Sequence, residues 1–192
     1  MTREKSSESM TNGLILLNRG DGVLEDCIFP KPFITKPILI FGYGNLSRGD
    51  DALGVLMLEH IEAHFDLTNI ELQTDFQLQI EHALDLENRE LVIFVDASVK
   101  SDIAFEFTRL QPVRDLSHTT HAMSPAAILD TYQTIKKETP PPCFLLAIGA
   151  DSFELGDDLG KKAKQNLSKA CELMDNLLKQ PILEFWQMQV IH

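Results

Sequence analysis

The sequence predicts an α/β protein: a three-layer α/β/α sandwich around a mainly parallel, five-stranded twisted sheet. Short apolar runs alternate with segments in which apolar residues recur every three or four positions, which is the rhythm of strands followed by helices. The 192 residues suffice for one full core, and a hydrophobic content of 44% is ordinary for a globular protein. Together these observations favour a single α/β domain.

The apolar runs locate the strands of this sheet. Strands are expected at Ile38–Tyr43, Ile70–Asp75, Leu91–Val95, Ile103–Leu110 and Cys143–Ile148. The run that starts at Leu91 is apolar throughout, which is typical of a strand covered on both faces, whereas the alternation in 103–110 suits an edge strand. Helices are expected at Asp51–Phe65, Gln77–Glu87, Pro125–Lys136 and Gly160–Lys179.

The two ends of the chain fall outside this rhythm. Residues 1–36 form an N-terminal extension, whose polar residues 1–12 are expected to be disordered and whose apolar run at 14–17 suits either a strand or a docked arm. Prolines at 30, 32 and 37 make the last part a linker. The domain is expected at 37–180, and a tail at 181–192 follows Pro181.

Charge and cysteine content exclude several classes of protein. A net charge of -12 disfavours a nucleic-acid partner, because an acidic surface repels phosphates. The chain's cysteines (Cys27, Cys143 and Cys171) form no Cys-x-x-Cys pair, which argues against a cysteine zinc site and for a reducing compartment. The polar N-terminus lacks the apolar core of a signal peptide, and no apolar run approaches the roughly 18 residues of a membrane span. We therefore expect a soluble cytoplasmic protein without a membrane partner.

A glycine-rich turn with an acidic pair follows the first domain strand. Gly42 and Gly44 suggest a dinucleotide fingerprint, but the position of its third glycine holds Ser47, and carboxylates would repel a pyrophosphate. No P-loop and no Gly-x-Ser-x-Gly elbow is present. The acidic pair, Asp50 and Asp51, precedes the first helix. One aspartate is enough to cap that helix, and Asp50 is expected to serve this helix terminus and the turn.

Ligands of open α/β sheets bind beyond the carboxyl ends of the strands. Asp51 is expected there, as are Asp96 after the third domain strand and either His118 or His121 before the helix at 125. Two carboxylates and an imidazole can bind a divalent metal and leave positions open for water or substrate. The remaining histidines (His60, His64, His82 and His192) are expected on the surface.

Four blocks in order resemble nickel–iron hydrogenase maturation proteases, peptidases that remove the C-terminal extension of a hydrogenase large subunit after nickel insertion. They are Gly42-Tyr-Gly-Asn-Leu-Ser-Arg-Gly-Asp-Asp-Ala-Leu-Gly54, Leu91–Ala97, His121-Ala-Met-Ser-Pro-Ala-Ala-Ile-Leu129, and Ile148–Gly156 with the last helix. Gln77-Leu78-x-x-Glu81 is similar to a block in the subset that serves cytoplasmic, cofactor-linked hydrogenases. The resemblance covers roughly residues 37–180 and implies a phosphorylase/hydrolase-like fold.

The resemblance implies an endopeptidase whose metal ligands and catalytic residues are Asp51, Asp96 and His121. The nickel is implied to arrive with the precursor, which makes cleavage conditional on a loaded substrate. Gly42, Gly44, Asn45 and Asp50 form a supporting turn, whose backbone amides shape the site or stabilise an oxyanion. This chain has Asp51 where relatives often have Glu, and Ala52 where many have Gly.

Two other functions remain open at this point. A maturation factor that checks or carries nickel without cutting would share the three ligands, and only a protease would release a peptide. A generic α/β hydrolase or peptidase, such as a spore-type protease of related fold, would act on another precursor.

Overall fold

The computed structural model describes residues 9–11, 14–16, 35–99, 103–114 and 123–190. The chain divides into two compact units, of which the first ends at Thr35. In that unit, β1 (Ser9–Thr11) and β2 (Leu14–Leu16) pair as antiparallel strands. Residues 9–11, predicted to be disordered, therefore form a strand against the apolar run that follows them.

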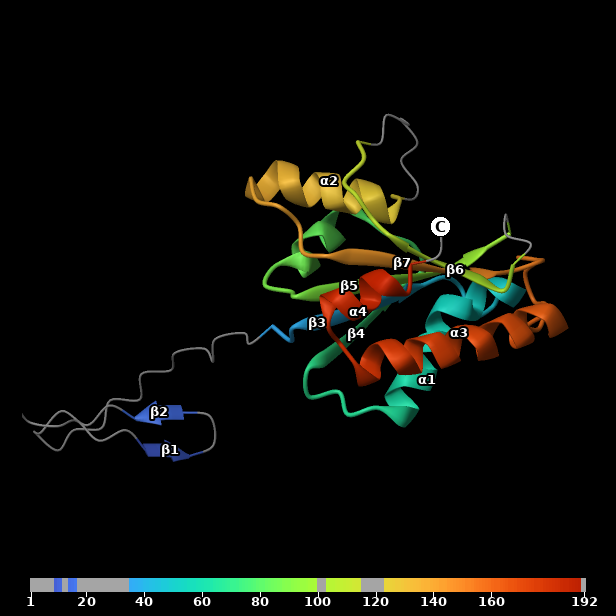
Figure 1. Ribbon diagram of the computed structural model, residues 1–192. Coiled ribbons are helices and arrows are strands. Elements are labelled where there is room, and N and C mark those ends of the chain that lie inside the picture. The colour runs from blue at the N-terminus through green and yellow to red at the C-terminus, as the bar shows by residue number, and fades with distance from the viewer. Residues whose placement is uncertain (1–8, 12–13, 17–34, 100–102, 115–122, 191–192) are drawn as a thin grey trace, which may run out of the picture. The chain divides into compact units, whose positions relative to one another are not determined.

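The second unit starts at Lys36 and is built on a five-stranded sheet. Its strands are β3 (Ile38–Tyr43), β4 (Ile70–Asp75), β5 (Leu91–Ser98), β6 (Phe105–Arg109) and β7 (Cys143–Gly149). The spatial order is β4-β3-β5-β7-β6, and the edge strand β6 is the one that runs antiparallel to its neighbour (Figure 1). This confirms the predicted mainly parallel sheet and the predicted edge strand.

Helices cover both faces of this sheet (Figure 1). On one face lie α1 (Leu53–His64), α3 (Lys161–Lys179) and α4 (Leu183–Met188); on the other lie η2 (Ile80–Leu86) and α2 (Pro125–Lys136). Successive strand residues alternate between the two layers, so that Ile40 packs under α1 while Phe41 packs under η2 and α2. The predicted three-layer sandwich is confirmed.

Three elements differ from their predicted form. The helix predicted from Asp51 begins with a 3₁₀ turn, η1 (Gly49–Ala52). The helix predicted at 77–87 is also 3₁₀, and its buried Ala83 and Leu86 lie three residues apart, the spacing at which 3₁₀ side chains line up. Strand β5 runs beyond Asp96 to Ser98 because its backbone continues to pair with β7 there.

The predicted tail packs into the core of the second unit. Trp186 of α4 is fully buried, and its Nε1 donates a hydrogen bond of 2.9 Å to the carbonyl oxygen of Leu177. Its ring meets Phe144 of β7 edge-on, with 5.6 Å between ring centroids. Burial of an indole ring of this size contributes several kcal/mol to stability, so residues 183–188 belong to the domain.

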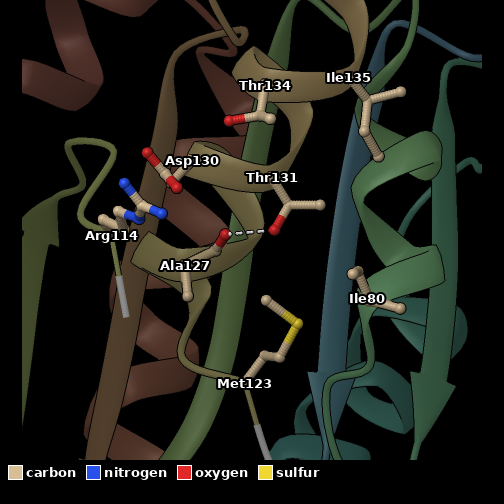
Figure 2. Close-up of a pocket in the computed structure, with 8 residues that line it drawn as sticks. All are labelled: Ile80, Arg114, Met123, Ala127, Asp130, Thr131, Thr134 and Ile135. Atoms are coloured by element: carbon tan, nitrogen blue, oxygen red, sulfur yellow. Dashed lines mark hydrogen bonds between the residues drawn. The ribbon is translucent and has the colours of Figure 1, made fainter. Parts of the chain in front are cut away.

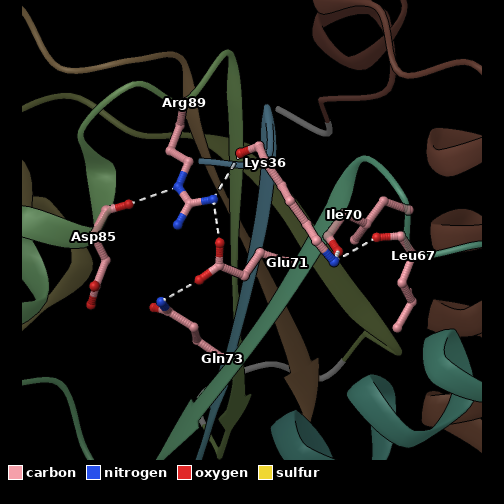
Figure 3. A network of polar contacts seen from close by, with 7 residues as sticks. All are labelled: Lys36, Leu67, Ile70, Glu71, Gln73, Asp85 and Arg89. Carbon is pink, nitrogen blue, oxygen red and sulfur yellow. Dashed lines mark hydrogen bonds and ion pairs between the residues drawn. The ribbon is translucent and has the colours of Figure 1, made fainter. Parts of the chain in front are cut away.

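A polar network secures the edge strand β4 at the start of the sheet (Figure 3). The Arg89 guanidinium donates to Glu71 Oε2 and to the Lys36 carbonyl oxygen, both at 2.7 Å, and Lys36 Nζ donates to the carbonyl oxygens of Leu67 and Ile70. Arg89 is nearly buried, so the ion pair holds the chain entering β3 against β4. This network lies at the amino ends of the strands, away from the carboxyl edge.

Candidate functional site

The turn after β3 places Asp51 at the carboxyl edge of the sheet. Asp51 Oδ2 accepts a hydrogen bond of 3.0 Å from the backbone amide of Asn45. Gly44 has a φ of +136°, and a Cβ at that position would overlap the carbonyl oxygen of Asp51. The turn therefore needs a glycine at position 44, because the backbone of the acidic pair folds back against it.

Asp96 lies beside this turn on the neighbouring strand. Gly42 pairs with Val95 in the parallel register, so the next residues along, Tyr43 and Asp96, are neighbours on the same face of the sheet. The Tyr43 hydroxyl donates a hydrogen bond to the Asp96 carboxyl group. Asp96 was predicted to follow its strand, but it lies within β5 and pairs with Ala147 of β7.

The environment of Asp96 disfavours its charged form. Burial raises the pKa of Asp96 to about 6, hydrogen bonds from Tyr43 and the Ala97 amide oppose the rise, and the charge of Asp51 adds to it. Asp51 and Asp96 are therefore close enough to repel each other. Burial, followed by the Asp96 charge, also raises the pKa of Tyr43 well above its usual range, which keeps the phenol protonated as a donor.

The predicted histidine ligand cannot be placed beside these carboxylates. His118 and His121 both lie outside the described residues. Across the described part of the chain, no three His, Cys, Asp or Glu side chains are grouped to bind a metal ion. The structure thus brings together the two predicted carboxylates, Asp51 and Asp96, whose oxygen atoms suit a divalent cation that needs further ligands.

Asp50 serves a different helix from the one predicted. Its buried carboxylate accepts hydrogen bonds from the backbone amides of Asp151 (2.8 Å), Ser152 (3.3 Å) and Gly160 (2.7 Å). In the described part of the chain no side chain caps the start of η1 or α1, whereas Gly160 is the residue that precedes α3. Asp50 therefore binds the loop between β7 and α3 to the turn, instead of capping the helix that follows it.

The turn offers few free donors for an oxyanion. The amides of Gly44, Ser47, Arg48 and Gly49 already donate to oxygen atoms of Asp75, Asn45 and Asp157. The Asn45 amide is likewise used by Asp51. The supporting turn of Gly42, Gly44, Asn45 and Asp50 consequently acts through shape, and the predicted oxyanion role of these amides does not fit.

Two participants were missed by sequence reasoning. Tyr43 was placed in a strand without a role, although alternation puts it on the same face as Phe41, and strand order then brings it to Asp96. His82, predicted on the surface, is largely covered: its ring packs 4.7 Å from that of Phe41, and its Nε2 lies 3.5 Å from Asp75 Oδ2. Its Nδ1 accepts from the Gln79 amide, so the proton is on Nε2, facing Asp75.

The thiols of Cys143 and Cys171 are poor candidates for chemistry. Burial raises the pKa of the Cys143 thiol far above its ordinary value, and burial together with the charge of Asp175 raises that of Cys171 to about 11. Reactive cysteines have a lowered pKa.

A pocket between η2 and α2, lined by Ile80, Arg114 and Ile135 among others, is a separate feature on the other layer (Figure 2).

Several solved structures of similar fold are named hydrogenase maturation proteases or endopeptidases. The protease HycI from Thermococcus kodakarensis aligns with a TM-score of 0.57 and 24% identity over 76% of this chain and 94% of its own. The hydrogenase maturating endopeptidase HybD from Escherichia coli gives 0.58 and 24% over 74% and 92%. An endopeptidase from Escherichia coli gives 0.59 and 21% over 75% and 93%. At these identities the likeness establishes a common fold.

Sequence comparison adds no closer assignment. No protein-family model matches the chain, and no curated protein matches it. None of the helices in the described part of the chain is long and apolar enough to cross a membrane.

Proposed function

We propose that this chain is an endopeptidase that removes the C-terminal extension of a nickel–iron hydrogenase large-subunit precursor carrying nickel. The observation that supports it most is the convergence of Asp51 and Asp96 at the carboxyl edge of the sheet, where α/β proteins bind their ligands. The solved neighbours that share the fold are named hydrogenase maturation proteases and endopeptidases.

The nickel ion is part of the substrate in this proposal. Asp51, Asp96 and His121 supply two carboxylates and an imidazole, a donor set that suits a divalent ion already held in part by the precursor. Such an ion polarises a peptide carbonyl or lowers the pKa of water. Cleavage then depends on nickel loading, because the protease's own ligands leave the coordination sphere incomplete.

The chain's own groups supply the remaining chemistry. Peptide hydrolysis adds water to the carbonyl carbon, breaks the C–N bond and transfers a proton to the leaving nitrogen. One of the two carboxylates, Asp51 or Asp96, takes a proton from the attacking water as general base and passes it to the leaving nitrogen. The Tyr43 hydroxyl holds Asp96 in place, and its high pKa keeps the donor proton on the tyrosine.

A processing assay tests the proposal. Candidate precursors, with and without nickel, are incubated with the full chain, and mass spectrometry follows the shortened subunit and the released peptide. We expect cleavage of the nickel-loaded form, and its loss in Asp51→Ala, Asp96→Ala and His121→Ala with the circular dichroism spectrum unchanged. The matched variant His118→Ala should be much milder. Normal cleavage by all three variants would overturn the assignment.

The same assay separates the two alternatives. A factor that only checks or carries nickel would bind the loaded precursor and release no peptide. A peptidase for another class of precursor would leave the hydrogenase subunit intact with or without nickel.

A further inference from the structure

A pocket of about 600 Å³ lies directly beside the Asp51 turn. Its walls are the loop Gly44–Ser47, the last two residues of β4 (Thr74 and Asp75) with Phe76 directly after them, and Val55 of α1. Two of its residues also build the site: the Asn45 amide donates to Asp51 Oδ2, and the Gly44 amide donates to the Asp75 carbonyl oxygen at 3.1 Å. A group seated in this pocket therefore lies next to the turn that holds Asp51.

Large apolar side chains on two separate loops contribute to this pocket. Phe76 is 72% exposed and Leu46 is 55% exposed, so neither is part of the core. Leu155 is 76% exposed, and the amide of the next residue, Gly156, donates a hydrogen bond of 2.8 Å to the carbonyl oxygen of Ser47 in the pocket wall. Apolar side chains gathered at the mouth of a polar site are a common mark of a surface that a partner covers.

The charges around the pocket restrict its occupant. Among the described residues that line the pocket there is no lysine or arginine, and Asp75 contributes a carboxylate. The Oδ1 of Asp75 accepts from the Phe76 amide at 2.6 Å, which fixes the backbone that carries the Phe76 ring. With Asp51 and Asp96 nearby, an acidic ligand is disfavoured, whereas a large uncharged apolar side chain gains from contact with Leu46, Val55 and Phe76.

We propose that this pocket is a specificity subsite, which seats one large apolar side chain of an extended polypeptide segment next to the scissile bond. The inference rests on the proposed function and names the residues that recognise its substrate. An extended chain advances about 3.3–3.6 Å per residue, so the recognised side chain lies within a few residues of the cleaved bond. Phe76 and Leu46 act in binding and touch no reacting atom.

Kinetics of precursor cleavage by the full chain test this subsite. Phe76→Ser and Leu46→Ser should each raise KM about tenfold and leave kcat nearly unchanged, because the lost contact is made equally before and during the reaction. Both side chains are exposed, so the melting temperature should stay at the wild-type value. Ile80→Ser and Ile135→Ser are matched controls, since these side chains are 60% and 54% exposed at the other pocket, and KM should not change (Figure 2).

A double-mutant cycle identifies the side chain that the pocket receives. Large apolar residues of the precursor near the cleaved bond are changed to Ser one at a time. One change should raise KM about tenfold for the wild-type enzyme and add little for Phe76→Ser, because the two substitutions remove the same contact. Substitution of that precursor residue by Asp should raise KM more than substitution by Lys, because the surroundings of the pocket are acidic.

The possible results separate the two proposals. If the wild-type chain cleaves the precursor and both pocket variants keep its KM, the subsite is wrong while the endopeptidase stands. A lowered kcat at constant KM also overturns the subsite. If the wild-type chain cleaves no nickel-loaded precursor, the proposed function fails and the subsite fails with it.

Discussion

The Tyr43 hydroxyl donates a hydrogen bond to the Asp96 carboxyl group across the adjacent parallel strands β3 and β5. The bond joins the strand that leads into the glycine turn to the strand that carries the second carboxylate. Since Asp51 lies on that turn, this one hydrogen bond connects the part of the candidate site that carries Asp51 with the part that carries Asp96.

Tyr43→Phe should slow processing and preserve the fold. The substitution keeps the ring but removes the donor, and a hydrogen bond to a charged group contributes about 1.5–3 kcal/mol. We expect processing of the nickel-loaded precursor to fall roughly 10- to 100-fold, measured as kcat/KM. The control is Tyr132→Phe, which also removes one hydroxyl group but lies on α2. Phe41→Tyr is not suitable as a control, because it would add a hydroxyl group to a buried ring. Equal loss in both variants would contradict a specific role for Tyr43.

Asp96→Asn should stabilise the folded chain at neutral pH. The fold raises the pKa of Asp96 from the usual 3.8 to about 6 and so favours the protonated form. Below about pH 4 the carboxyl group is protonated and does not reduce the free energy of unfolding. As the pH rises from 4 to 6 the burial of Asp96 lowers that free energy, by on the order of 3 kcal/mol above this range. Urea unfolding should show the variant more stable at pH 7.5 and equal to wild type at pH 3.5. A difference of the same size at both pH values would rule out this origin.

Asp50→Ala should destabilise the protein strongly. The carboxylate accepts hydrogen bonds from the backbone amides of Asp151, Ser152 and Gly160, and its removal takes this acceptor away from all three. A loss of about 2–4 kcal/mol in the free energy of unfolding is expected. Asp151→Ala is the control, because that carboxylate forms an exposed ion pair with Lys162 and its removal should change stability by less than about 1 kcal/mol. Comparable stabilities of the two variants would refute the role given to Asp50.

Trp186→Ala should show that the end of the chain is part of the domain. Loss of a fully buried indole is expected to lower the free energy of unfolding by about 3–5 kcal/mol. Trp186→Phe retains most of the packing and loses the hydrogen bond to Leu177, so its effect should be smaller. Met188→Ala, at a side chain that is 72% exposed, should be neutral in the same denaturation experiment. If Trp186→Ala unfolds like wild type, residues 183–188 are not part of the core.

The sequence by itself determined the layer architecture, and it predicted that Asp51 and Asp96 lie at one edge of the sheet. Strand and helix signals are local: β3, β4 and α2 have the predicted bounds because apolar periodicity and capping act within a few residues. Parallel strands end at one edge of a sheet, so Asp51 and Asp96 were predicted at the same edge from their places in the chain.

Only the tertiary structure decided which partners these local elements meet. Asp50 binds the Gly160 amide, 110 residues further along the chain, and no local pattern distinguishes that contact from capping of its own helix. The Tyr43–Asp96 bond required the strand order, and the burial of Trp186 required helix α4 to pack against Phe144 of β7. Periodicity reports which face of an element is buried, whereas the partner on that face is chosen by packing among segments distant in sequence.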